Sequence, residues 1–335
     1  MTWEDDPIFK GQGGQLWTLG DAVAPCFRLS AYFPYREAHP YTNTEAFEEL
    51  FACFAPILRD HCDRIRMWDR PGAKARRATK IKAGDWTPFR HLKSVYSDVE
   101  HGIWTGFYFI DRREDREMAG GKPCSFRYFV YGDATILDAC VPLGDWRAGR
   151  LDIAAVKAAL QKIPYYSMVA GYGLSLRETY HANELPPIAL KYPALDLAAA
   201  TSRNYFPDEW PDKERNHYWI AGISWLTGIG EPFLTWLGGT KAITNGLPAA
   251  ILVDEAQHGV IFQLGPQPIT GEAGVDDAHL QLYHALGQRL RPHDFHVKDE
   301  DMESIGQSEP YRSFGPVFGE MAWEESLRWA RRSYS

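Results

Sequence analysis

Three histidines and one aspartate near the end of the chain are side chains that could bind a metal ion. They are His284, His293, Asp294 and His296. Imidazole and carboxylate groups ligate zinc when helical or tight-loop spacing brings them to one point, and His293 and His296 can approach within one turn. A metal-dependent hydrolase is therefore one function that the sequence leaves open. The other interpretation is that these are exposed polar residues following a helix that ends before Pro292.

A basic segment from Arg59 to Lys93 is the second candidate for chemistry. It holds 11 Lys and Arg against four Asp, a local charge of +7, and it contains Trp68 and Trp86. Cationic side chains and aromatic rings together can bind single-stranded nucleic acid. However, the whole chain has a formal charge of −8, so the remainder sums to −15 and should repel nucleic acid. We expect no nucleic-acid partner, and we interpret residues 67–86 as a long exposed connection.

Acidic residues recur in clusters outside the basic segment. One cluster surrounds Trp210 and consists of Asp208, Glu209, Asp212 and Glu214. Other clusters lie at residues 254–255, 272–277 and 299–303. An acidic surface attracts a basic protein partner and raises its rate of encounter. The alternative is that these are solvated loops that keep the protein soluble.

Motifs for nucleophilic catalysis or phosphate binding are absent from the sequence. Neither G-x-G-x-x-G nor G-x-x-x-x-G-K-[ST] occurs, and Ser224 lacks the G-x-S-x-G spacing of a hydrolase nucleophile. The five cysteines are far apart and form no C-x-x-C pair, which favours reduced, buried thiols: Cys26, Cys53, Cys62, Cys124 and Cys140. We therefore expect a binding protein with no catalytic residue, cofactor or metal.

The start of the chain and its hydropathy indicate where the protein acts. Its first ten residues are acidic, where a secretory signal would be basic and then apolar. No apolar run approaches the roughly 18 residues that a membrane helix needs. We expect a cytoplasmic protein that does not interact with a membrane.

The elements that must position these groups are mixed strands and helices. In the first half the expected order is β-α-β-β-β-α-β, at residues 26–33, 44–58, 102–110, 125–132, 134–142, 151–163 and 165–176. A proline-rich stretch at 181–215 is the best candidate for a linker or covering segment. In the second half we expect a strand, a helix, a hairpin and a helix, at residues 217–224, 232–237, 249–265 and 278–290.

This order predicts an α+β fold in which antiparallel sheets are flanked by helices. Both halves resemble β-α-β-β-α, which suggests two related units, although no sequence repeat is visible. At 335 residues the chain is long enough for two domains. We place the first domain at residues 1–185 and the second at 186–335. The oligomeric state is left open.

Three segments within and just before the Trp- and Gly-rich stretch at 218–274 carry a family resemblance. The first is Tyr192, Pro193, Leu195 and Asp196, with Ala194 in place of a glycine. The second is Trp225, Leu226, Thr227, Leu237, Gly238 and Gly239, and the third is Gly265, Pro266, Pro268, Gly271 and Glu272. Together they resemble the TsiV family of bacterial type VI secretion immunity proteins, which is associated with protection from VRR-Nuc nuclease toxins.

This resemblance implies a non-enzymatic protein that binds a cognate toxin effector in the cytoplasm and blocks its active site or substrate cleft. It transfers no catalytic residue and does not identify the toxin. Nuclease clefts are basic because they hold phosphates, so an acidic inhibitor can occupy one by charge mimicry. We expect the motif residues to form the scaffold, and Asp208, Glu209, Trp210, Asp212 and Glu214 to contact the toxin.

Overall fold

A single antiparallel sheet organises the part of the chain that the structure describes. The computed structural model describes residues 3–6, 9, 23–34, 40–68, 78–95, 106–111, 124–131, 134–176, 188, 191–196 and 223–290. Ten strands form the sheet in the order β3-β2-β4-β5-β6-β1-β7-β8-β10-β9, and each neighbouring pair is antiparallel. The strands are β1 Val23–Pro34, β2 Cys62–Trp68, β3 Thr79–Lys80, β4 Gly106–Asp111, β5 Ser125–Tyr131, β6 Ala134–Pro142, β7 Ser167–Leu176, β8 Leu226–Gly230, β9 Ile251–Ala256 and β10 Gly259–Leu264.

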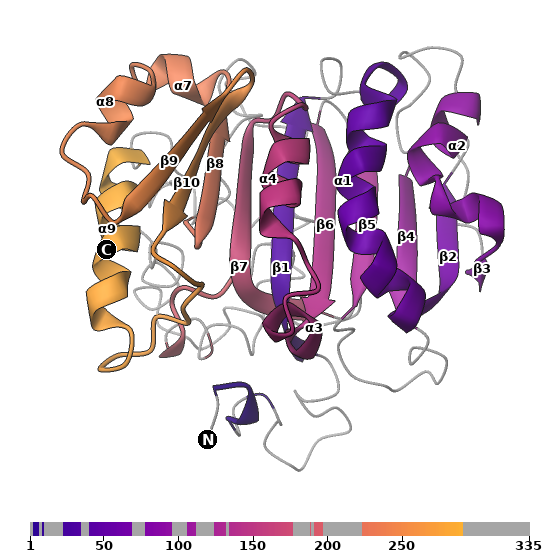
Figure 1. Ribbon diagram of the computed structural model, residues 1–335, viewed down its shortest axis with the longest axis horizontal. Coiled ribbons are helices and arrows are strands. Elements are labelled where there is room, and N and C mark those ends of the chain that lie inside the picture. Colours follow the sequence, from indigo (N-terminus) through magenta and orange to yellow (C-terminus); the bar gives the residue numbers. More distant parts are fainter. Residues whose placement is uncertain are drawn as a thin grey trace, which may run out of the picture.

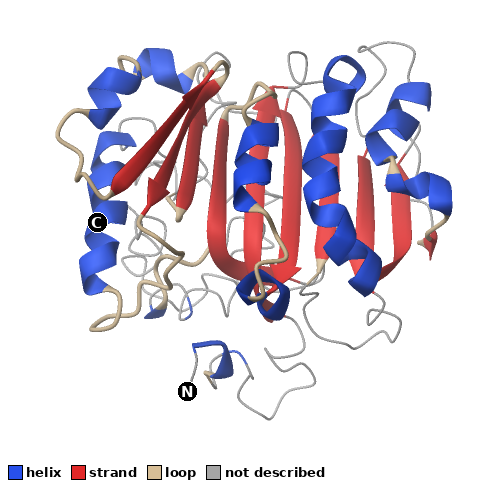
Figure 2. Ribbon diagram, in the orientation of Figure 1, coloured by secondary structure: helices blue, strands red, loops and turns tan. Residues whose placement is uncertain are grey.

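Helices flank this sheet, which confirms the predicted α+β class. Figure 1 shows α1, α2 and α4 on the near face of the sheet and α9 behind β9 and β10; Figure 2 separates helices from strands by colour. The helices are α1 Pro40–His61, α2 Pro88–Val95, α3 Leu143–Arg147, α4 Ile153–Leu160, α7 Phe233–Trp236, α8 Thr240–Thr244 and α9 Asp277–Leu290, with short 3-10 turns η1 Trp3–Asp5 and η4 Ala83–Trp86.

Alternate residues of β1 divide the two faces of the sheet, as the period of two in a strand requires. Phe27 and Phe33 point toward the helices, where Phe27 stacks on Trp146 of α3 at 3.9 Å and Phe33 lies 5.2 Å from Phe47 of α1. Arg28 points to the opposite face and is fully buried there. The central strand therefore has an aromatic face under the helices and a charged residue on its other side.

The predicted amphipathic pattern of α1 is confirmed. Leu50, Phe51, Phe54 and Leu58 recur at helical spacing, and each is 1% exposed or less. Phe51 packs edge-on against Phe126 of β5 at 5.1 Å. The helix continues through Pro56 to His61.

The prediction of a long connection at residues 67–86 is wrong in its described parts. Residues 67–68 complete β2, residues 79–80 form β3, residues 83–86 form η4, and α2 follows. Arg64 and Arg66 alternate with Ile65, which is 2% exposed, so charged residues in every second position concealed a strand that pairs with both β3 and β4 and has one apolar face. Residues 69–77 lie outside the described part.

The prediction of a strand at 217–224 is also wrong at residues 223 and 224, the two that the structure describes. Ile223 and Ser224 precede the strand, which is β8, and residues 217–222 lie outside the described part. Glycines lower strand propensity, but close packing in β8 leaves no room for a side chain at Gly228 or Gly230. A Cβ on Gly228 would lie 2.4 Å from Cγ of Met168, and a Cβ on Gly230 would lie 1.7 Å from the carbonyl oxygen of Tyr165.

The sheet is continuous across the proposed domain boundary at 185/186, because β7 pairs with β8. Among the described residues from 223 to 290, the order is β8-α7-α8-β9-β10-α9. The division into two related units stays a prediction. Among the described helices, none has the length and apolar character required to cross a membrane.

Candidate functional site

Backbone and indole hydrogen bonds join the three motif segments. The amide of Ala194 donates to the carbonyl of Thr270 at 2.9 Å, which ties residues 192–196 to the third motif. Nε1 of Trp225 donates to the carbonyl of Gly265 at 3.0 Å, and the amide of Leu264 donates to the carbonyl of Trp225 at 2.8 Å. The segments that are separated in sequence are thus in direct contact beside β8 and β10.

Gly271 lies at a close approach between the first and third motifs. Its φ is +80°, and a Cβ there would lie 2.9 Å from both the backbone nitrogen of Ala194 and Cγ of Pro193. One carboxylate oxygen of Asp276 accepts hydrogen bonds from the Gly271 amide and from the amide and hydroxyl of Thr270, at 2.9 to 3.1 Å. Both backbone conformation and space therefore require glycine at this position.

Asp196 connects its motif to the middle of the sheet through Arg28. Nε of Arg28 lies 2.7 Å from Asp138 and 3.6 Å from Asp196, and the Ser30 hydroxyl donates to Asp196 at 3.1 Å. Burial lowers the pKa of Arg28, but the two carboxylates outweigh burial and raise the net pKa above its ordinary value. Arg28 is consequently a permanent cation that holds two buried carboxylates.

The remaining motif residues lie mainly inside the protein. Thr227 accepts from the Ser224 amide at 3.1 Å and donates to the Ser224 carbonyl at 2.9 Å. Leu226, Tyr192 and Pro268 are buried, Pro193 and Glu272 are half-buried, and Pro266 is exposed. Gly238 and Gly239 connect α7 to α8 with φ of +82° and +84°. The surface that the motifs offer is therefore limited to Pro266 and Gly238, which are exposed, and to the half-buried Pro193, Leu237, Gly239 and Glu272.

The residues that the sequence predicts for toxin contact, Asp208, Glu209, Trp210, Asp212 and Glu214, lie outside the described residues. The same holds for His293, Asp294 and His296 of the metal-site alternative, whereas His284 is half-buried on α9. Among the residues that the structure does describe, no group of three or more His, Cys, Asp or Glu side chains could hold a metal ion.

The described cations of the basic segment are distributed over several elements. Arg59 of α1 lies over the Trp86 ring at 4.9 Å, and Arg90 of α2 pairs with Glu45 at 2.5 Å. Arg64 and Arg66 belong to β2. The structure therefore brings Arg59 and Arg90 together with acidic and aromatic groups of the same protein.

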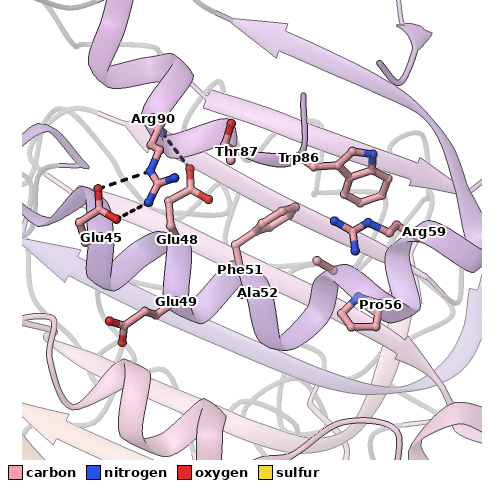
Figure 3. Close-up of a pocket in the computed structure, with 11 residues that line it drawn as sticks. Glu45, Glu48, Glu49, Phe51, Ala52, Pro56, Arg59, Trp86, Thr87 and Arg90 are labelled. Carbon is pink, nitrogen blue, oxygen red and sulfur yellow. Dashed lines mark hydrogen bonds and ion pairs between the residues drawn. The ribbon is translucent and has the colours of Figure 1, made fainter. Parts of the chain in front are cut away.

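A groove of about 350 Å³ lies between α1 on one side and η4 with α2 on the other (Figure 3). Its walls are Glu45, Glu48, Glu49, Phe51, Ala52, Ala55, Pro56, Arg59, Trp86, Thr87 and Arg90. The glutamates gather at one end and Arg59 with Trp86 at the other. Pro56 has no N–H, so it cannot donate to the Ala52 carbonyl one turn earlier, and both residues line the groove.

Each of the three glutamates of the groove has a hydrogen-bond or ion-pair partner within the protein. The Arg90 amide donates to Glu48 at 2.9 Å, while the Arg90 guanidinium binds Glu45 and Lys162 binds Glu49. Burial raises the pKa of Glu48 above its ordinary value, against the lowering effect of the Arg90 amide and charge. Glu45 and Glu49 are exposed, but their carboxylates already pair with Arg90 and Lys162 of the same protein.

This groove is not among the sites that the sequence predicts. A signal was present, because Glu45, Glu49, Ala52, Pro56 and Arg59 recur at three- and four-residue spacing along α1, beside its apolar stripe. The opposite wall has no such signal, since the connection expected at residues 67–86 includes η4 and no helix is predicted at the position of α2.

The family profile described as "TsiV: Type VI immunity for VRR-NUC" matches residues 154–332, which is more than half of the chain. The matched range includes all three motif segments. No match was found among curated proteins.

A solved structure described as the Pseudomonas aeruginosa T6SS protein PA0821 is similar to this chain. The two share 20% sequence identity and a TM-score of 0.66, and the similarity covers 96% of this chain and 84% of the other. At this identity the comparison shows a shared fold.

Proposed function

The chain belongs to the TsiV family, and we propose that it is an immunity protein that binds a cognate type VI secretion toxin and neutralises it by occluding the toxin's active site or substrate cleft. The family match over residues 154–332 carries this proposal. The protein acts by binding rather than catalysis, and its proposed place of action is the cytoplasm, where it meets a toxin delivered or produced there.

The proposed scaffold is the set of contacts among the motif segments. Trp225 forms a hydrogen bond with Gly265, Ala194 forms one with Thr270, and Asp196 forms an ion pair with buried Arg28. These polar groups of the motifs are therefore paired within the protein. Specificity for one toxin then belongs to surface residues outside the motifs.

The proposed partner is a nuclease of the kind that the family description names. A nuclease cleft is positively charged because it binds a polyanion, and this chain has a formal charge of −8. The acidic cluster of Asp208, Glu209, Asp212 and Glu214 would occupy that cleft in place of phosphates. Trp210 within the cluster would provide an aromatic anchor at the centre of the interface.

Charge reversal tests this assignment. Lysine at Asp208, Glu209, Asp212 and Glu214 should abolish protection of cells that express the toxin and weaken binding by about 100-fold or more, since several close charge pairs would become repulsive. The probe is a catalytically inactive form of the cognate toxin, whose gene we expect beside the gene for this chain, and binding is measured by calorimetry.

A matched control carries the same change in net charge at another acidic cluster. Lysine at Asp299, Glu300, Asp301 and Glu303 should leave the affinity within about threefold of the original. Equal losses in both variants would mean that only net charge matters. Unchanged affinity in the first variant would refute the assigned surface, and no binding by the unaltered protein would refute the proposed function.

A further inference from the structure

Strand β9 forms one end of the ten-stranded sheet, and its outer edge is open in the described part of the chain. β9 pairs with β10 along Ile251 to Ala256, and β10 pairs with β8 on its other side. Figure 1 shows β9 in orange at the end of the sheet opposite β3. An edge strand presents unpaired backbone groups to which a strand of another chain can add.

The pairing register identifies which backbone groups point outward. The Leu264 amide bonds to Trp225 on the β8 side, and hydrogen bonding along an antiparallel strand alternates between its two neighbours. Gly259, Ile261 and Gln263 therefore bond to β9, at Ala256, Asp254 and Leu252. The residues between these, Ile251, Val253 and Glu255, direct their backbone groups to the open edge.

Two of these outward residues can offer both a donor and an acceptor. The Ile251 amide is already bonded to the Pro248 carbonyl at 3.0 Å. Within the described residues, the amides and carbonyls of Val253 and Glu255 have no bonded strand beside them. An incoming strand could therefore form four main-chain hydrogen bonds at these two positions.

The side chains of β9 also fit an added strand. Leu252 is 55% exposed and Val253 is 36% exposed, and both are among the few large apolar residues that the described surface exposes. Edge strands are commonly protected by lysine, proline or a bulge. β9 has the sequence ILVDEA, and its register with β10 is regular, so it has no lysine, proline or bulge, and its only charges are the carboxylates of Asp254 and Glu255.

The charge on β9 selects the partner. Its charged residues are Asp254, which Lys157 of α4 binds at 2.5 Å on the helical face, and Glu255, which is exposed on the other face. Opposite charges on directly facing residues stabilise paired strands. A strand with apolar residues facing Leu252 and Val253 and a lysine or arginine facing Glu255 is complementary to this edge.

We propose that β9 is a docking edge to which a cationic β-strand of the toxin adds, extending the sheet across the interface. This inference rests on the proposed function, because that function supplies the toxin as partner. It adds the mode of recognition: main-chain hydrogen bonds at Val253 and Glu255 hold the strand, and Leu252 with Glu255 selects its side chains.

Substitution Val253→Pro tests the docking edge. Proline removes the outward N–H and places its ring where the partner strand must lie, and it is tolerated on an outward-facing edge position. Val253→Ala is the matched control, since it removes similar apolar area and keeps the donor. We expect Val253→Pro to weaken binding of the inactive toxin by about 30-fold and Val253→Ala by about threefold.

Hydrogen exchange on the unaltered protein provides a measurement that does not depend on folding of the variant. The Val253 and Glu255 amides should exchange readily in the free protein and slow by about tenfold or more in the toxin complex. Toxin binding without this protection refutes the docking edge and leaves the proposed function intact. Absence of toxin binding refutes the proposed function itself.

Sedimentation of the protein alone distinguishes a second copy of the chain as the occupant. If the protein is a dimer, if Val253→Pro makes it a monomer, and if toxin affinity is unchanged, then β9 pairs with its own copy and the proposal is wrong. A monomer that loses toxin affinity on Val253→Pro while remaining folded supports the proposal.

Discussion

Substitution Gly271→Ala tests whether the first and third motifs depend on each other. Gly271 has φ of +80°, which costs an alanine roughly 1–2 kcal/mol. The new Cβ would also lie 2.9 Å from the Ala194 nitrogen and Pro193 Cγ, so residues 193–194 must move. Such overpacking costs about 1–3 kcal/mol, and the movement strains the Ala194 to Thr270 hydrogen bond. We expect a total loss of about 3–4 kcal/mol in the free energy of unfolding.

Gly274→Ala is the control for backbone conformation alone. Gly274 has φ of +76°, but a Cβ there meets no heavy atom within 4 Å. It should lose only about 1–2 kcal/mol. In urea unfolding, the two variants should therefore differ by about 2 kcal/mol, or about 1 M in midpoint at an m value of about 2 kcal/mol/M. Equal midpoints would refute the contact between the motifs as a source of stability.

Three further predictions concern buried charge, pH and metal content. Arg28→Met should destabilise the protein by about 3–5 kcal/mol in urea unfolding, because Asp138 and Asp196 would stay buried without a cation; a loss below about 1 kcal/mol would contradict this pairing. Burial raises the pKa of Glu48 above 4.5, so ionising this group costs the folded state more than the unfolded state. The contribution of Glu48 to stability is therefore complete below pH 4.5 and is lost as the pH rises toward the folded pKa. Over that rise, the stability of Glu48→Gln should increase relative to that of the original protein. A difference in stability that does not change with pH would argue against burial as the cause. Elemental analysis of the purified chain should find no stoichiometric metal, whereas one metal per chain that is lost on His293→Ala would support the hydrolase alternative.

Hydrophobic periodicity predicts much of the fold, because the spacing of apolar residues along a short segment shows which face of its helix or strand is buried. The spacing of Leu50, Phe51 and Phe54 predicts α1, and two apolar runs around residues 255–258 predict the hairpin of β9 and β10. The pattern failed in β2, where Arg64 and Arg66 occupy alternate positions, and in β8, where Gly228 and Gly230 lower strand propensity.

Part of the candidate site could also be predicted from the sequence. The motif residues were identified by type and spacing, but their contacts could not be, since Ala194 and Thr270 are 76 positions apart. The groove between α1 and α2 required two elements to pack side by side, and only α1 was expected. The open edge of β9 depends on the order of strands, which no local pattern contains.

The sequence by itself determined the α+β class, the aromatic face of α1, the acidic balance of the chain and the family to which it belongs. These follow from residue type and short-range spacing, because burial period and net charge are properties of the chain before it folds. The tertiary structure decided that Arg28 meets Asp138 and Asp196, that Gly271 lies against Ala194, and that β9 ends the sheet. Such contacts join residues far apart in sequence, and the free energy that selects them exists only when the whole core packs.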